Sequence, residues 1–194
     1  MRKFAVVLMV FVFMFSFGVQ AKAFEDDFVS FENCISSNVP VWIGGLFNIG
    51  YERKITENLS AKVRAAYWAL SGLFNQEGEI ENFAMGYIGA DVLFYPAGEA
   101  LTGFAFGPKY DLWMGGFTAL DMINNPTVGL QLHFVGAQVA HKWVFDSGFS
   151  MNIVLGGLAN VAVSAQAGDE EYIGDPPLAG IFMPFFDFEI GYAF

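Results

Sequence analysis

The chain has one cysteine and two histidines, and both shortages limit what it can do. With Cys34 alone, no disulfide can form within the chain. The residues before it, Phe31-Glu32-Asn33, lack the small and apolar pattern of a lipoprotein signal. We therefore expect a buried or unreactive thiol, with pairing to a second chain as the alternative.

Positive charge is also scarce. There are nine Lys and Arg against 20 Asp and Glu, and the net charge is −11. Nucleic-acid-binding domains carry a basic patch or stripe, which this composition does not supply. The sequence therefore excludes nucleic acid as a partner.

The N-terminal residues have the order of a secretory signal peptide. Arg2 and Lys3 precede the apolar run Phe4–Val19, and Ala21-Lys22-Ala23 places small residues at the −3 and −1 positions. The run has about 16 residues, whereas a helix needs about 20 to span a bilayer. We expect export and cleavage after Ala23. Residues 24–194 would then form one domain with a net charge of −14, because the leader removes three cations and no acid.

Beyond residue 23 the chain lacks a helical membrane span, although it is very apolar. The sequence is 55% hydrophobic, contains 23 Phe and has a mean hydropathy of +0.44. A domain of this size has a limited interior, so we expect part of the apolar surface to face lipid. The best candidate for a helix, residues 147–168, is uncharged, but its polar residues fall on even positions and its apolar ones on odd positions. A period of two indicates a strand.

The same alternation recurs along the chain and predicts a transmembrane β-barrel. Segments of ten or more residues with a polar inner face and an apolar outer face are typical of that fold. The further segments are 39–52, 59–68, 83–95, 101–114, 128–145 and 186–194. The pattern of 128–145 is less regular, and we predict a β-bulge near Gly136.

The connections alternate between short and long, which predicts the orientation of the barrel. Residues 55–58, 96–100 and 146–148 are short turns, whereas 71–82, 115–127 and 165–178 are longer. Bacterial barrels have short periplasmic turns and longer outer loops. An even strand count requires one more strand, and Phe28–Ile35 is the candidate. We predict an all-β, single, up-and-down antiparallel barrel of eight strands, or ten if an outer loop folds as a hairpin.

Charges of both signs project inward by parity and form a predicted lumen charge cluster. Eight strands leave an interior just wide enough for side chains, so opposite charges there should pair and block the bore. From the hairpin at 55–58 we expect Glu52 to pair with Lys62 or Arg64, and Asn48 to lie opposite or near Arg64. The cluster comprises Glu52, Lys62, Arg64, Asp91, Lys109, Asp111, Asp187 and Glu189, with Lys142 as a further inward cation.

Two other interpretations of the lumen remain open. One is a gated or very narrow pore. The other is a carrier of small hydrophobic molecules, which the inward aromatic residues Phe83, Tyr87 and Trp113 suggest.

The last residues alternate without a break. Large apolar residues occupy every second position and the two acids lie between them. This pattern predicts the C-terminal assembly signal of outer-membrane proteins, recognised by the barrel-assembly machinery through strand pairing. An ordinary amphipathic edge strand is the alternative. The signal residues are Phe186, Phe188, Ile190, Tyr192 and Phe194.

Several strand-to-turn motifs carry a family resemblance across most of residues 39–194. They are Gly50-Tyr51-Glu52-Arg53-Lys54 with Glu57-Asn58-Leu59-Ser60, Asp91-Val92-Leu93-Phe94-Tyr95-Pro96, Phe106-Gly107-Pro108 and Lys142-Trp143-Val144-Phe145. With them the chain resembles the small OmpA/OmpX-like outer-membrane β-barrels. The resemblance implies a fold and a location in the bacterial outer membrane, and it does not imply a task.

We expect no catalytic, cofactor or metal site. Barrel enzymes that modify lipid A need a base next to a nucleophile or a water-activating acid. No Ser lies within two residues of His133, and His141 next to Lys142 and Trp143 is typical of the membrane interface. The predicted function is structural or surface interaction by a monomer, with outer-membrane lipid and lipopolysaccharide as partners. A lipid A-modifying enzyme is a further alternative.

Export can be tested directly. The mature protein purified from membranes should begin at Phe24, because Ala21 and Ala23 fit the small-residue sites of signal peptidase. Intact-mass measurement decides this, and retention of Met1 would instead indicate an anchored protein.

Assembly can be tested at the last strand. Changing Tyr192 and Phe194 to Ser should reduce membrane insertion and leave secretion across the inner membrane intact, because only the strand that is recognised changes. The measurement is membrane abundance, together with the faster gel mobility expected of an unboiled barrel. Normal abundance with that mobility retained would contradict an assembly signal.

Overall fold

The structure is a computed structural model and describes residues 31–39, 45–69, 80–119, 127–167, 170–174 and 182–194. The expected signal peptide lies outside these residues. No helix within the described ranges is long and apolar enough to cross a membrane.

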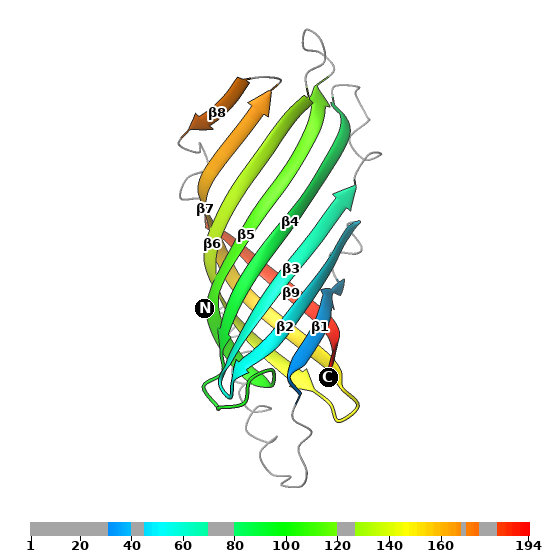
Figure 1. Cartoon of the computed structure of the whole chain (residues 1–194), viewed down its shortest axis with the longest axis vertical. Helices are drawn as coiled ribbons and strands as arrows, with labels where there is room; N and C mark the ends of the chain where they lie inside the picture. Colours follow the sequence, from blue (N-terminus) through cyan, green and yellow to red (C-terminus); the bar gives the residue numbers. More distant parts are fainter. Residues whose placement is uncertain (1–30, 40–44, 70–79, 120–126, 168–169, 175–181) are drawn as a thin grey trace, which may run out of the picture.

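The described strands form a closed antiparallel barrel (Figure 1). Eight strands make the wall, each pairing with the next from β1 to β7, while β9 joins β7 to β1. The predicted eight-stranded barrel is therefore confirmed. The wall strands are β1 (Asn33–Asn38), β2 (Leu46–Thr56), β3 (Leu59–Ala69), β4 (Ile80–Phe94), β5 (Gly103–Ala119), β6 (Thr127–Val144), β7 (Phe149–Ala167) and β9 (Phe182–Ala193).

A ninth, short strand extends the upper end of β7. Strand β8 (Glu170–Gly174) pairs with Val163–Ala167, beyond the last β7 residue that pairs with β9. It falls in the predicted outer loop 165–178. The loop thus forms a hairpin on β7, but it adds no strand that closes the wall, and the ten-strand alternative is wrong.

Strand boundaries differ from the prediction at the start of the barrel. The first strand was expected at Phe28–Ile35 and lies at Asn33–Asn38, because it pairs from Cys34 onward with a β9 strand that ends at Ala193. The second begins at Leu46 instead of residue 39, and residues 40–44 lie outside the described ranges. It continues to Thr56, which pairs with Leu59 and leaves only a two-residue turn.

The predicted bulge near Gly136 is wrong. Strand β6 pairs with β5 in one unbroken register, so Gln131 and His133 stay on the same outward face. The irregularity lies across from it, where Val161 of β7 is skipped between the partners of His133 and Phe134. Gly136 instead allows the backbones of β6 and β7 to approach closely, because a Cβ at this position would lie 2.0 Å from the Gly157 carbonyl oxygen.

The two faces of the wall differ sharply in polarity. Outward side chains are large, apolar and exposed, as in Phe47, Ile49, Val63 and Phe186. Inward positions carry the buried polar and charged groups. This is the reverse of a water-soluble domain, whose apolar groups gather in the core.

Candidate functional site: the charged lumen

The structure places all eight residues of the predicted lumen charge cluster on the inner face of the barrel. Seven of them are nearly fully buried, from Glu52 at 1% exposed to Arg64 at 8%, and Asp187 is half-buried. Lys142 is also inside, at 2% exposed. The cluster and Lys142 together bring four cations and five carboxylates into one narrow interior.

One ion pair joins residues near the ends of β2 and β6, where these strands lead into the short turns at the lower end of the barrel in Figure 1. The Lys142 ammonium donates to Glu52 Oε2. Glu52 Oε1 accepts two further hydrogen bonds, from Ser60 Oγ at 2.6 Å and from the Tyr95 hydroxyl at 2.7 Å. Both oxygens of this fully buried carboxylate are thereby satisfied, which a desolvated charge requires.

The next inward residue of β3, Lys62, forms the second ion pair. Its Nζ lies 2.6 Å from both Oε1 and Oε2 of Glu189 on β9. Asn152 Nδ2 donates to Glu189 Oε2 at 2.9 Å, and Ser36 Oγ does so at 3.4 Å. The pair therefore ties β3 to β9 and is held by groups from β7 and β1.

The next inward residue of β3, Arg64, binds two carboxylates. Its Nε and one terminal nitrogen each lie 2.8 Å from an oxygen of Asp91, and the same terminal nitrogen lies 2.6 Å from Asp111 Oδ1. Such forked bonds are stronger and more specific than those of a point charge. Gly89 provides the room, because a Cβ there would lie 2.3 Å from Asp111 Oδ1.

An aromatic group lies beside this arginine on the inner face. The Arg64 guanidinium carbon lies 5.6 Å from the ring centre of Tyr87, which stacks on Trp113 at 5.1 Å. Trp113 in turn meets Phe134 edge-on at 6.3 Å. Of the predicted inward aromatics, Tyr87 and Trp113 are thus adjacent, and the Phe83 side chain lies outside the described set.

The predicted partners of Glu52 are wrong. Lys62 does stand directly opposite Glu52 in the β2–β3 register, but its ammonium binds Glu189. Arg64 stands opposite Gly50, and Asn48 opposite Ala66. The register of one hairpin relates only neighbouring strands, whereas long side chains in a narrow closed barrel also reach partners on strands that are not adjacent.

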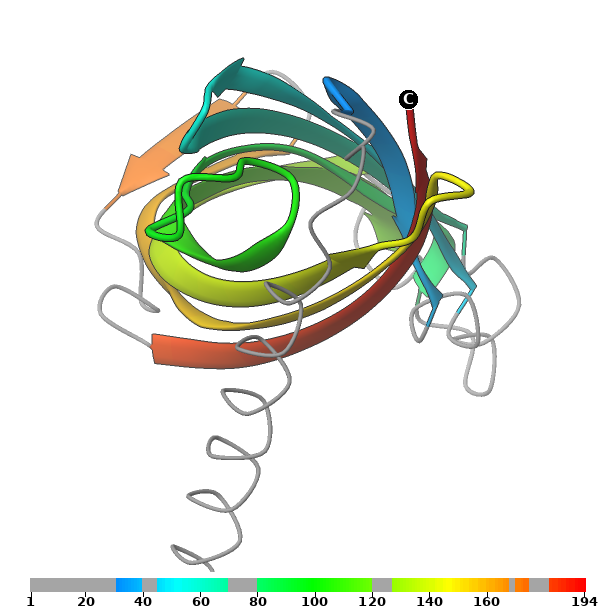
Figure 2. The ribbon, with the colours of Figure 1, turned by 90° about the horizontal axis from the view of Figure 1, so that it is seen from below.

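The lower mouth is covered by the turn between β4 and β5, whereas the sequence pattern predicted only a short connection at residues 96–100. Figure 2 shows this green turn lying across the lower opening. Tyr95 and Leu101 are each 1% exposed, and Tyr95 N donates to the Asn58 carbonyl at 2.8 Å. Parity could have identified Tyr95, because it continues the inward series Gly89, Asp91, Leu93.

Leu101 adopts a backbone conformation that bulky residues avoid. Its φ is +76°, and among the described residues other than glycine it alone has a positive φ. Such strain costs on the order of 1–3 kcal/mol and persists only where the surroundings hold it. Burial of the leucyl side chain in the barrel mouth is the compensating contact.

The remaining candidates lie apart from this network. His133 faces outward, and its Nδ1 is 2.8 Å from the Tyr110 hydroxyl. His141 is covered by the Trp143 ring, with 4.4 Å between ring centres. Cys34 is buried at the lower end, with its Sγ 3.4 Å from Ser150 Oγ. Within the described residues, no group of three or more His, Cys, Asp or Glu could hold a metal ion.

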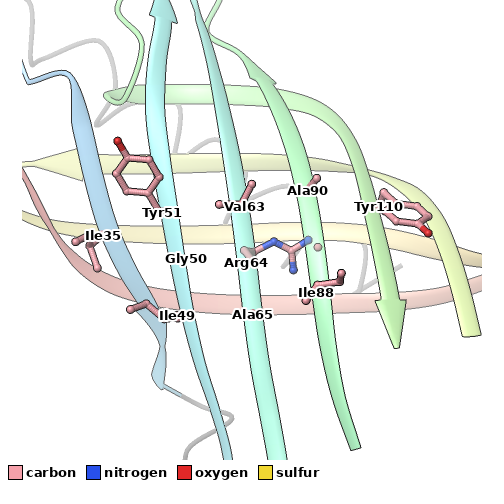
Figure 3. Close-up of a pocket in the computed structure, with 11 residues that line it drawn as sticks. Ile35, Ile49, Gly50, Tyr51, Val63, Arg64, Ala65, Ile88, Ala90 and Tyr110 are labelled. Atoms are coloured by element: carbon pink, nitrogen blue, oxygen red, sulfur yellow. The ribbon is translucent and has the colours of Figure 1, made fainter. Parts of the chain in front are cut away.

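The outer wall carries a shallow apolar groove of about 550 Å³ across β1 to β5 (Figure 3). Its rim is formed by Ile35, Ile49, Tyr51 and Tyr110, and the small residues Ala65 and Ala90 leave the hollow. Neighbouring residues point to opposite faces. The groove therefore belongs to the apolar exterior, while Arg64 behind it belongs to the lumen.

No family model and no curated protein matches the chain. Two solved structures are similar to it. One is a major outer membrane protein from Thermus thermophilus, with 13% identity over 84% of this chain and 99% of that chain and a TM-score of 0.48. The other is CarO of Acinetobacter baumannii, with 7% identity over 88% and 100% and a TM-score of 0.40. The barrel assignment itself rests on the strand pairings described above.

The ion pair that the structure shows for Glu52 can be distinguished by experiment from the pairs expected from the hairpin. Lys142→Met should destabilise the barrel by about 3 kcal/mol, because the Glu52 carboxylate stays buried without its cation. Adding Glu52→Gln should recover part of that loss. Urea unfolding in detergent micelles, followed by gel mobility, measures both.

Arg64→Met provides the matched comparison. It should also destabilise the barrel, but adding Glu52→Gln should give an additive loss, because the two residues share no ion pair in the described network. Recovery by Glu52→Gln in the Arg64→Met background, and not in the Lys142→Met background, would support the hairpin pairing instead.

Proposed function

We propose that the chain is an outer-membrane β-barrel with a structural or surface-interaction role and a lumen closed to ions. The observation that carries this proposal is the reversed polarity of the barrel, with apolar groups outside and paired charges inside. A lipid-facing belt accounts for the outward residues, because only closed barrels and helices satisfy their backbone groups in a bilayer. The most exposed are Phe47, Phe182, Ile49, Val63, Tyr67, Phe186 and Tyr192.

Closure of the lumen is supported at two levels. Three successive inward residues of β3 (Ser60, Lys62 and Arg64) each bond to a carboxylate inside the bore. Lys62 reaches Glu189 on β9 and Arg64 also reaches Asp111 on β5, and neither strand is next to β3. Beneath them the β4–β5 turn covers the lower mouth with Leu101 and Tyr95. An ion crossing this interior would have to break buried ion pairs, which is costly.

A bacterial outer membrane is the proposed location. Outer-membrane lipid and lipopolysaccharide would contact the exterior, and the barrel-assembly machinery would be the partner during insertion. This proposal is supported by the alternation in β9, where Phe186, Phe188, Ile190 and Tyr192 lie on the outward face, and Phe194 follows the strand. We propose a monomer without catalytic activity.

A carrier of small hydrophobic molecules, or a narrow channel, is the second candidate. The stack of Tyr87, Trp113 and Phe134 on the inner face is the observation that favours it. A hydrophobic ligand on this stack would change the Trp113 fluorescence of the wild type, and Trp113→Phe would abolish that response. The third candidate, a lipid A-modifying enzyme, is tested by lipid A mass spectra from a deletion strain.

Planar-bilayer recording tests the closed lumen. The wild-type barrel should show no steady conductance, because its ion pairs and the β4–β5 turn fill the bore. Folding of the protein must be verified in the same preparation by heat-dependent gel mobility, so that an absence of conductance can be attributed to a closed barrel and not to a missing one. A stable open channel would overturn the closed lumen and favour the pore.

A further inference from the structure

Two charged residues of the lumen join none of the four direct ion pairs that the described residues form. They are Lys109 on β5 and Asp187 on β9. Lys109 is 4% exposed, and its Nζ lies over the Phe185 ring at 4.7 Å from the centre. Asp187 Oδ1 accepts a hydrogen bond from Asn38 Nδ2. A buried cation without a direct carboxylate partner requires some other acceptor.

Both residues line the same internal cavity. Its volume is about 10 Å³, and Asn152 and Gln138 also contribute to its wall. Asn152 is 3% exposed, and its Nδ2 donates to Glu189. Its other atom, Oδ1, is buried and accepts no hydrogen bond from any described residue. The cavity thus joins a cation, a carboxylate and an unpartnered amide oxygen.

The chemistry of these three groups restricts the occupant. An ammonium needs an acceptor, whereas a carboxylate and an amide oxygen both need donors. A water molecule supplies two O–H donors and an oxygen that accepts up to two hydrogen bonds, and the cavity has about the volume that one water needs. An anion would face Asp187 and Glu189, and a metal cation would face Lys62 and Lys109. A neutral molecule that both donates and accepts is therefore favoured.

We propose that one water molecule occupies this cavity and bridges the Lys109 ammonium to the Asp187 carboxylate. It accepts a hydrogen bond from Lys109 Nζ and donates to Asp187 and to Asn152 Oδ1. Three hydrogen bonds are the usual number for a buried water, and a bridging water is nearly as favourable as a direct bond. The site belongs to the interior and does not depend on whether the barrel conducts.

A crystal structure of the wild-type barrel, at a resolution that shows ordered solvent, is the first test. We expect one solvent peak within hydrogen-bond distance of Lys109 Nζ, Asp187 and Asn152 Oδ1. A direct Lys109–Asp187 contact, an empty cavity, or an ion at that position would each overturn the proposal.

A matched pair of variants gives the second test. Asn152→Leu fills the cavity and removes one acceptor, so the water should be lost. Asn160→Leu is the control, because Asn160 Oδ1 is also buried and unpartnered but Asn160 does not line this cavity. The water should persist in the control. Its presence in Asn152→Leu, or its loss in Asn160→Leu, would contradict the bridge, and if neither variant folds the wild-type structure still decides.

Discussion

The structure depends on one constraint, namely that charges enclosed in a narrow bore must find partners there. Eight strands leave little room beyond that needed for side chains, so the polar inner face has little water to solvate it. Each carboxylate of the direct pairs is accordingly met by a cation, and Glu52 and Glu189 also by neutral donors such as Ser60, Tyr95 or Asn152. Three of the ion pairs, Lys142–Glu52, Lys62–Glu189 and Arg64–Asp111, join strands that the backbone ladder does not pair, and so they link separate parts of the barrel wall.

Small residues and one strained residue make this packing possible. Gly89 leaves the space that the Arg64–Asp111 contact occupies, and any side chain there would collide with it. Leu101 holds an unfavourable φ so that the β4–β5 turn can fold back over the mouth. The site is therefore a property of the whole interior, with β3 contributing its central cations and the lower turn contributing its cover.

The exterior satisfies the opposite requirement. Its aromatic and aliphatic side chains are exposed on the barrel wall, which in water would promote association and in lipid is favourable. The outward His133–Tyr110 hydrogen bond joins the imidazole of β6 to the neighbouring strand β5 on this exterior face. The polarity of each face is thus the basis for the proposed function.

The sequence by itself predicted the barrel, a wall of eight strands as the first choice, and the face on which most side chains lie; the outward face of Gln131 and His133 was decided only by the unbroken register of β6. A period of two is a local property of the chain, and it predicts the inward position of Glu52, Lys62 and Arg64 without any tertiary information. Only the closed structure decided which charge meets which. Glu52 bonds to Lys142, 90 residues away, because closure brings distant strands within reach of long side chains. The register within one hairpin could not reveal that partner. In the same way, the presence of Gly136 in the sequence could not show whether this glycine forms a bulge or allows a close backbone approach.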